Sequence, residues 1–142
     1  MQARVGLRKV LAVINPELDR LARARYVSIT TYRADGTPAA APAWCVSEGG
    51  YLQVIAKSSM GTVKRLRSNE NIAIAPCDSR GGLQGDPVDA TAAVIEDPEL
   101  VSRVEQLLRQ RYGLVARVLG WLNRLRGNEP NVALAITVPP GN

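Results

Sequence analysis

The sequence predicts an α+β fold: a six-stranded antiparallel β-barrel with flanking helices, formed by one domain over residues 1–142. The length is typical of one domain, and no repeat, low-complexity tract or linker divides the chain. Several segments rich in β-branched and aromatic residues follow one another through short turns. They do not alternate with helices, which excludes the Rossmann class of parallel α/β folds.

Residues 1–25 are predicted to be a helical segment in two pieces. Apolar residues recur at helical spacing from Val5 to Ile14. Asn15 followed by Pro16 is a helix-start signal, with the asparagine as N-cap and the proline in the first turn. The second helix therefore extends from Pro16 to about Arg25.

The next segments are predicted to form a three-stranded antiparallel meander. The strands are Tyr26–Tyr32, about Pro38 to Val46, and Tyr51 to about Ala56. An Asp-Gly pair in the first connection and two glycines in the second are typical of tight hairpin turns. Pro42 has no backbone N–H, so the second strand is expected at an edge, or bulged or split there.

The second half of the chain supplies the remaining strands and a pair of helices. A short helix within residues 57–69 is followed by strands at Ile72–Cys77 and Val88–Ile95, with a glycine-rich loop between them. Asp97 and Pro98 begin a helix pair at about 98–126 that Gly113 interrupts. The last strand alternates strictly, with Val132, Leu134, Ile136 and Val138 on one face.

The composition excludes several classes of active site. The chain has no histidine and two cysteines, Cys45 and Cys77, so it cannot by itself build a histidine-based triad or a histidine-ligated zinc site. Reactive chemistry would then come from a bound cofactor. The net charge of +5 favours an anionic partner: a phosphate, a polyanionic cofactor, nucleic acid or an acidic membrane surface. No secretory signal or membrane span is apparent, which predicts a cytoplasmic protein.

The stretch from Lys57 to Arg67 is the best candidate for an anion site. It holds four of the eighteen basic residues and no acid, just before and within a short helix. Backbone N–H groups at a helix start attract anions, and Ser58 or Ser59 is expected to cap the helix. Lys64 and Arg65 would bring positive charge to the same anion. A basic surface helix with a serine cap explains the same residues without any ligand.

The strand before this window offers a flat surface. Thr37 to Trp44 contains two prolines and a run of alanines, a floor that suits a planar heteroaromatic ring. An ordinary edge strand protected by prolines is the alternative. Trp44 and Trp121 are interpreted as core or interface aromatics, and Cys77 as a buried structural thiol. The basic helix expected over residues 114–126 is interpreted as packing its leucines on the protein body rather than on a membrane.

In order and spacing, these windows resemble the FMN-binding split-barrel superfamily, which includes pyridoxamine 5′-phosphate oxidase. The matching stretches are Tyr26–Pro38, Ala41–Trp44, Val63–Arg67, Ala75–Gly81, Arg111–Gly113 and Arg124–Gly127. The resemblance is greatest to the branch of small reductases that use the deazaflavin coenzyme F420. It implies a six-stranded split barrel that forms a homodimer, with two cofactor sites at the subunit interface.

The resemblance also implies roles for particular residues. Those that would hold the cofactor phosphate are Lys57, Ser58, Ser59, Gly61, Thr62, Lys64 and Arg65. Ala41, Pro42 and Trp44 would lie beside its ring system. No side chain need be the catalyst, because the reduced cofactor hands a hydride to a small organic substrate.

Two other functions remain open on the sequence. Family members often carry threonine near Ala56, serine near Met60 and lysine near Thr62, so a split-barrel protein that binds FMN, or a small molecule without any cofactor, is an alternative. Nucleic-acid binding ranks last, because stacking platforms need exposed aromatics beside the basic groove and none falls within residues 57–67.

Overall fold

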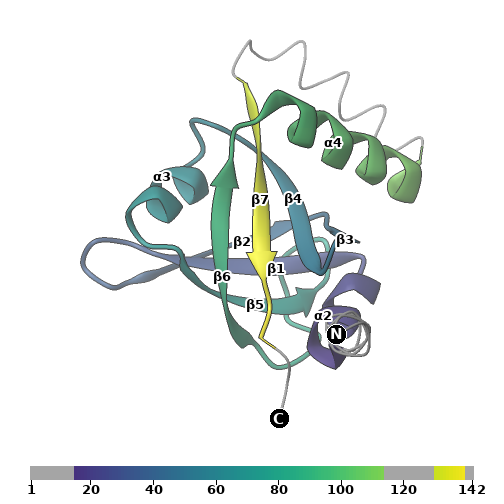
Figure 1. Ribbon diagram of the computed structural model, residues 1–142. Coiled ribbons are helices and arrows are strands. Elements are labelled where there is room, and N and C mark those ends of the chain that lie inside the picture. Colours follow the sequence, from purple (N-terminus) through teal and green to yellow (C-terminus); the bar gives the residue numbers. More distant parts are fainter. Residues whose placement is uncertain (1–14, 114–129, 140–142) are drawn as a thin grey trace, which may run out of the picture.

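The computed structural model describes residues 15–113 and 130–139. The helix expected from Val5 to Ile14, the helix expected over residues 114–126 and Trp121 lie outside these residues. Within them the chain forms three helices and seven strands (Figure 1). In chain order these are α2 (Pro16–Arg23), β1 (Tyr26–Tyr32), β2 (Pro38–Ala43), β3 (Val46–Glu48), β4 (Tyr51–Lys57), α3 (Gly61–Ser68), β5 (Asn71–Cys77), β6 (Val88–Ile95), α4 (Pro98–Tyr112) and β7 (Asn131–Thr137).

The strands form one antiparallel sheet in the order β2-β1-β5-β6-β7-β4-β3. The two strands at the ends of this order, β2 and β3, follow each other in the chain and are separated only by Trp44 and Cys45. The sheet therefore curls until its two edges meet at one corner. This confirms the predicted split barrel of the α+β class.

The corner at Trp44 and Cys45 corrects two predictions. The described residues hold seven strands rather than six, because the expected strand from Pro38 to Val46 is two strands. The expected meander is also wrong: β2 pairs with β1, whereas β3 pairs with β4. The predicted edge position of Pro42 is confirmed, since β2 ends the strand order.

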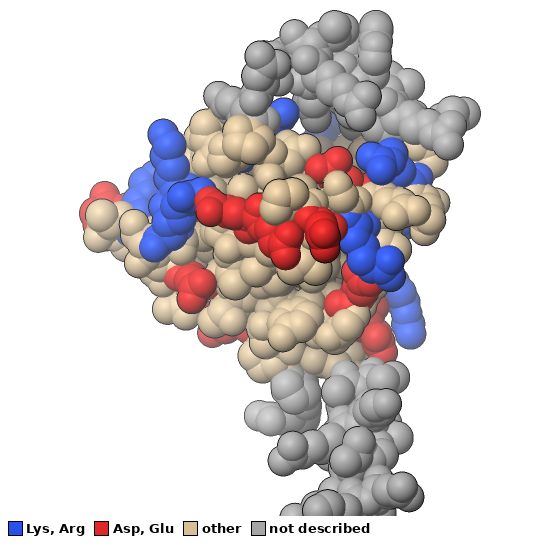
Figure 2. All heavy atoms as spheres, turned by 45° about the horizontal axis from the view of Figure 1, so that its top comes forward, with Lys and Arg blue, Asp and Glu red and all other residues tan. Residues whose placement is uncertain are grey.

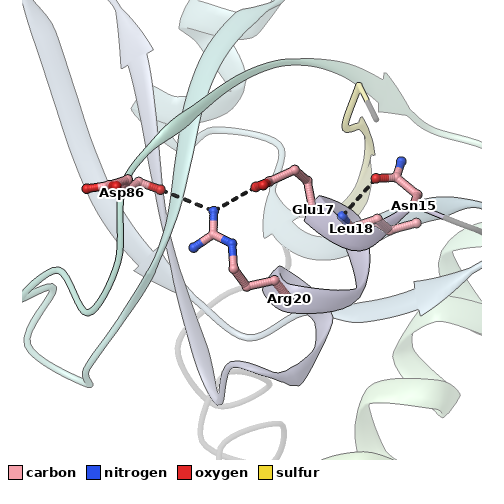
Figure 3. A network of polar contacts seen from close by, with 5 residues as sticks. All are labelled: Asn15, Glu17, Leu18, Arg20 and Asp86. Atoms are coloured by element: carbon pink, nitrogen blue, oxygen red, sulfur yellow. Dashed lines mark hydrogen bonds and ion pairs between the residues drawn. The ribbon is translucent and has the colours of Figure 1, made fainter. Parts of the chain in front are cut away.

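The start of α2 is fixed by a polar network that spans the chain (Figure 3). The Asn15 side chain accepts a hydrogen bond from the Leu18 N–H at 3.1 Å and donates one to the Val138 carbonyl at 2.8 Å. Arg20 donates to the Glu17 carboxylate at 2.8 Å and to the Asp86 carbonyl at 3.2 Å. The predicted Asn-Pro helix start is confirmed, and it also holds the end of β7 and the glycine-rich loop.

The main core fills the inside of the barrel. Its side chains come from the inward faces of all the long strands and from two helices, α2 through Leu18 and Leu21 and α3 through Val63 and Leu66. In Figure 1 these two helices lie on different sides of the barrel, α3 beside β6 and α2 below β3. Alternation of apolar residues along the strands produces this inside face.

Helix α4 lies on the outer surface of β3, β4 and β7 and builds a second, smaller core. Its apolar side chains Val101, Val104 and Leu108 pack on Ala133, with Ile55, Ile95 and Val46 at the margin. The helix begins at the predicted Asp97-Pro98 signal, where the Asp97 carboxylate accepts from the Glu99 N–H. It ends at Gly113, whose φ of 65° favours glycine.

The last residues of α4 clamp the barrel corner. Arg111 donates from one terminal nitrogen to the Cys45 carbonyl at 2.6 Å and from the other to the Ala24 carbonyl at 2.9 Å. The Tyr112 hydroxyl donates to the Arg25 carbonyl at 2.8 Å and accepts from the Cys45 N–H at 3.2 Å. Backbone groups that leave the strand ladder at the corner are therefore satisfied by side chains of α4.

Removing the Tyr112 hydroxyl tests this clamp. We expect Tyr112→Phe to lower the free energy of unfolding by about 1–3 kcal/mol, because the Cys45 N–H and the Arg25 carbonyl lose a partner. Urea unfolding followed by circular dichroism measures the change. Tyr51→Phe is the matched control, since that ring is 46% exposed, and it is expected to change stability by less than about 0.5 kcal/mol. Equal effects of the two substitutions would contradict the clamp.

Candidate functional site

The start of α3 is a tight turn directly after β4. The Met60 N–H donates to the Lys57 carbonyl at 3.0 Å, and the Ser58 N–H donates to the Pro130 carbonyl at 3.0 Å. Met60 is the N-cap residue and its side chain makes no capping bond. The prediction that Ser58 or Ser59 caps the helix is therefore wrong, because the turn places both serines before the cap position.

Arg65 folds back over this helix start. Its Nε donates to the Thr31 hydroxyl at 2.6 Å, a contact between α3 and β1. A Cβ atom on Gly61 would come within 2.7 Å of the nearer guanidinium nitrogen. The guanidinium thus lies against the first turn of its own helix, and the absence of a side chain at Gly61 makes the room for it.

The electrostatics of this helix start differ from those of the other two helices. Helix α2 has an Asn15 cap and acids in its first turn, and α4 has an Asp97 cap with Glu99 behind it. Helix α3 has no side-chain cap and no acid in its first turn. A guanidinium placed against the positive end of a helix is unfavourable unless an anion joins them. The arrangement therefore suits an anion.

The basic side chains of α3 differ in their contacts and do not all lie at the helix start. Arg67, near the end of the helix, pairs with Glu96 at 2.7 Å, whereas Lys64 is exposed and Arg65 is held by Thr31. Figure 2 shows acidic side chains gathered in a band on the face that it draws, with lysine and arginine groups on both sides. The basic charge on this face is therefore local rather than a continuous track for a polyanion.

The predicted phosphate-binding residues occupy one turn and the first half of α3, but their side chains do not all face the same way. Ser59 and Lys64 are exposed, and Lys57 and Ser58 are half-buried. Thr62 is buried with Val63 in the core-facing side of the helix. A lysine at position 62, frequent in the family, would have to bring its charge out from this buried side.

The predicted ring-binding residues divide between two places. Ala41 is half-buried and Pro42 exposed on the edge strand β2, which pairs with the strand that carries Thr31. The Thr31 hydroxyl, which holds Arg65, lies 3.3 Å from the Ala39 carbonyl of β2. Trp44 instead stacks on Tyr112, with ring centroids 4.6 Å apart, and packs in the second core. The structure thus connects β2 to Arg65 but holds Trp44 against α4.

Sequence reasoning missed Thr31, although the sequence carries a signal for it. Thr31 follows Val27 and Ile29 on the inward face of β1 and is fully buried. A hydroxyl on an apolar face needs polar partners, and Thr31 has two: it accepts from Arg65 Nε and donates to the Ala39 carbonyl. The signal in the sequence was therefore a polar residue at a position where the alternation of β1 predicts an inward-facing apolar one.

The cysteines and the buried tyrosine are poor candidates for reactive groups. Burial raises the pKa of the Cys45 thiol, and Arg111 offsets only part of this effect. Burial also raises the pKa values of Cys77 and Tyr112. Among residues 15–113 and 130–139, no group of three or more Cys, Asp and Glu is arranged to hold a metal ion. The interpretation of Cys77 as a buried thiol is confirmed.

The curled antiparallel sheet, with an uncapped helix directly after β4, defines a split β-barrel protein. The chain belongs to the pyridoxamine 5′-phosphate oxidase family, whose sequence profile matches residues 14–139. No curated protein matches the chain.

Solved structures similar to this chain share its fold at low identity. HutZ, the heme storage protein of Vibrio cholerae, is 18% identical, with 89% of this chain and 90% of that one covered and a TM-score of 0.63. Protein Rv2991 of Mycobacterium tuberculosis is 18% identical, with 87% and 79% covered and a TM-score of 0.62. An F420 reductase is 18% identical, with 86% and 90% covered and a TM-score of 0.53. At such identities the likeness establishes the fold.

The helices within the described ranges are too short or too polar to cross a bilayer.

The raised thiol pKa of Cys45 predicts how stability depends on pH. Because the folded state disfavours the thiolate, the contribution of this group is fully present below the ordinary thiol pKa of 9.0 and is lost as the pH rises above it. We expect the free energy of unfolding, measured by urea titration, to fall as the pH rises above 9.0. Cys45→Ala should show a shallower fall, and an unchanged slope would contradict this account.

Proposed function

We propose that the protein is an oxidoreductase that binds the deazaflavin coenzyme F420 and transfers a hydride between the reduced coenzyme and a small organic substrate. FMN is the alternative cofactor. Membership of the pyridoxamine 5′-phosphate oxidase family supports a phosphorylated cofactor. The observation that carries the proposal is the Arg65 guanidinium, held by Thr31 over the uncapped start of α3.

The donor set at this helix start fits a phosphate group. Arg65 supplies a fixed charge, Lys64 a second charge on an exposed side chain, and Gly61 an open backbone. Charge-assisted hydrogen bonds from these groups are stronger than neutral ones. In the proposed complex Lys57, Ser58 and Ser59 complete the surroundings of the phosphate, and Thr62, whose side chain is buried, would contribute through its backbone N–H.

In this proposal the cofactor supplies the hydride chemistry, and the chain supplies binding and position. No histidine is present in the chain and both thiols are buried, so its own side chains offer little reactive chemistry. The edge strand β2, with Ala41 and Pro42, gives the rings a surface with small side chains. Holding the phosphate at one end would fix where the rings lie against this strand and the substrate.

We further propose that the protein works as a homodimer with two cofactor sites at the subunit interface. Trp44 would then contribute to the site from the corner where it stacks on Tyr112. A dimer would also exclude water from rings that lie on an edge strand.

Titration with cofactor tests the proposal. Purified protein is titrated with F420 and with FMN, and binding is followed by fluorescence. We expect Arg65→Ala to weaken binding of the preferred cofactor roughly ten- to a hundredfold, because a charge-assisted contact with phosphate is lost. Arg67→Ala is the matched control: it removes the same charge from the same helix, but Arg67 pairs with Glu96. Its effect should be less than about threefold.

Two results of this titration would contradict the proposal. Failure of both cofactors to bind below millimolar concentration would favour a split-barrel protein that takes a small molecule without cofactor. Equal losses in Arg65→Ala and Arg67→Ala would show that general charge, not the helix start, holds the anion.

Thr31→Val tests the positioning of Arg65 separately from its charge. The substitution keeps the side-chain shape but removes the hydroxyl that accepts from Arg65 Nε. We expect cofactor affinity to fall roughly three- to tenfold, less than in Arg65→Ala, because the guanidinium remains but is no longer fixed. Thermal unfolding of the variant checks that the barrel is intact. Unchanged affinity would mean that Thr31 does not position the arginine.

A further inference from the structure

Helix α4 covers only half of the outer face that it packs on. Ile55, Ala133 and Ile95 lie side by side on β4, β7 and β6 and form the floor under the helix. Two residues further along these strands, Gln53, Ala135 and Ala93 form the next row. This second row lies beside α4 rather than beneath its apolar core.

The second row is the floor of a groove of about 650 Å³. The small side chains of Ala93 and Ala135 lie at the bottom of the groove. Tyr51 of β4 and Leu100 of α4 line its sides, and these two residues are 46% and 50% exposed. Its volume lies within the range of small-molecule sites, about 300–1,000 Å³. A low floor between two apolar side chains suits a flat molecule.

Among the described residues, one buried side-chain polar atom at the groove has no hydrogen-bond partner. The side-chain oxygen Oε1 of Gln53 is buried, and no atom of the described residues hydrogen-bonds to it. Three charged residues lie at the rim: Glu48 and Arg103 pair with each other, and Glu70 is an exposed acid for which no ion pair is found among the described residues. The rim therefore disfavours an anionic ligand and suits a neutral one. A buried carbonyl oxygen without a partner is costly, and a ligand that pairs with it removes this cost. Because Oε1 is enclosed, the Gln53 carboxamide has to turn toward the groove to meet such a ligand.

We propose that this groove binds a planar, largely apolar molecule whose edge presents adjacent hydrogen-bond donor and acceptor groups, such as a lactam, to the Gln53 carboxamide. A carboxamide has an acceptor oxygen and a donor nitrogen side by side, so it pairs with such an edge through two bonds. The site shares no residue with the start of α3 and goes beyond the proposed function.

Calorimetric titration with carbostyril, a flat bicyclic lactam, tests the proposal. We expect saturable binding that Gln53→Leu weakens roughly tenfold, because both bonds to the lactam edge are lost. N-methylcarbostyril, which lacks the donor, should bind the unaltered protein with a similar loss. Gln106→Leu is the matched control, because Gln106 is an exposed glutamine of α4 outside the groove. It should leave carbostyril affinity unchanged.

Ala135→Phe supplies a second, independent variant. A phenyl ring beside Gln53 fills the floor and should abolish saturable binding, with thermal unfolding as the check that the variant folds. Absence of binding to the unaltered protein, or equal affinity in Gln53→Leu, would overturn the proposal. So would displacement of carbostyril by FMN, which would assign it to the cofactor site. A change of sedimentation coefficient in Gln53→Leu would instead assign the groove to a second copy of the chain.

Discussion

The clamp of Arg111 and Tyr112 on the corner at Cys45 is the constraint on which the rest of the structure depends. A curled sheet closes into a barrel only if one strand can leave one edge and join the other. Here that change takes place over Trp44 and Cys45, and the backbone N–H and carbonyl of Cys45 form hydrogen bonds with Tyr112 and Arg111 of α4. The corner makes β2 an edge strand paired with β1 alone, and β1 carries the threonine that holds Arg65. The candidate site is therefore a consequence of how the barrel closes.

The start of α3 lacks the stabilising side-chain cap that α2 and α4 have. Capping by asparagine or aspartate typically stabilises a helix by about 1 kcal/mol, and α2 and α4 both have such caps. Helix α3 has an exposed methionine at that position and an arginine over its first turn. Departures from good local design are expected where a protein binds something, because the ligand restores what the free protein lacks.

Much of this fold was predictable from local patterns. Alternation predicted β1 with the bounds that the structure gives, the expected strand Val88–Ile95 matches β6, and capping signals predicted both ends of α4. The corner was not predictable in this way, because its hydrogen bonds come from a helix 66 and 67 residues further along the chain. The serine cap failed because a turn held by Lys57 and Met60 moved the helix start beyond both serines. Arg65 was found from charge, but its contact with Thr31 is tertiary.

The choice of arginine, fixed by a neutral hydroxyl, indicates what kind of site the proposed anion site would be. Arginine is a permanently cationic type of side chain, and a threonine neither adds nor removes charge. The chain has no histidine to titrate near neutrality. Any pH dependence of anion binding in this range would then come from the ligand's own phosphate. Such a site is suited to holding a tail permanently in place rather than to moving protons, which agrees with chemistry that belongs to the cofactor and position that belongs to the protein.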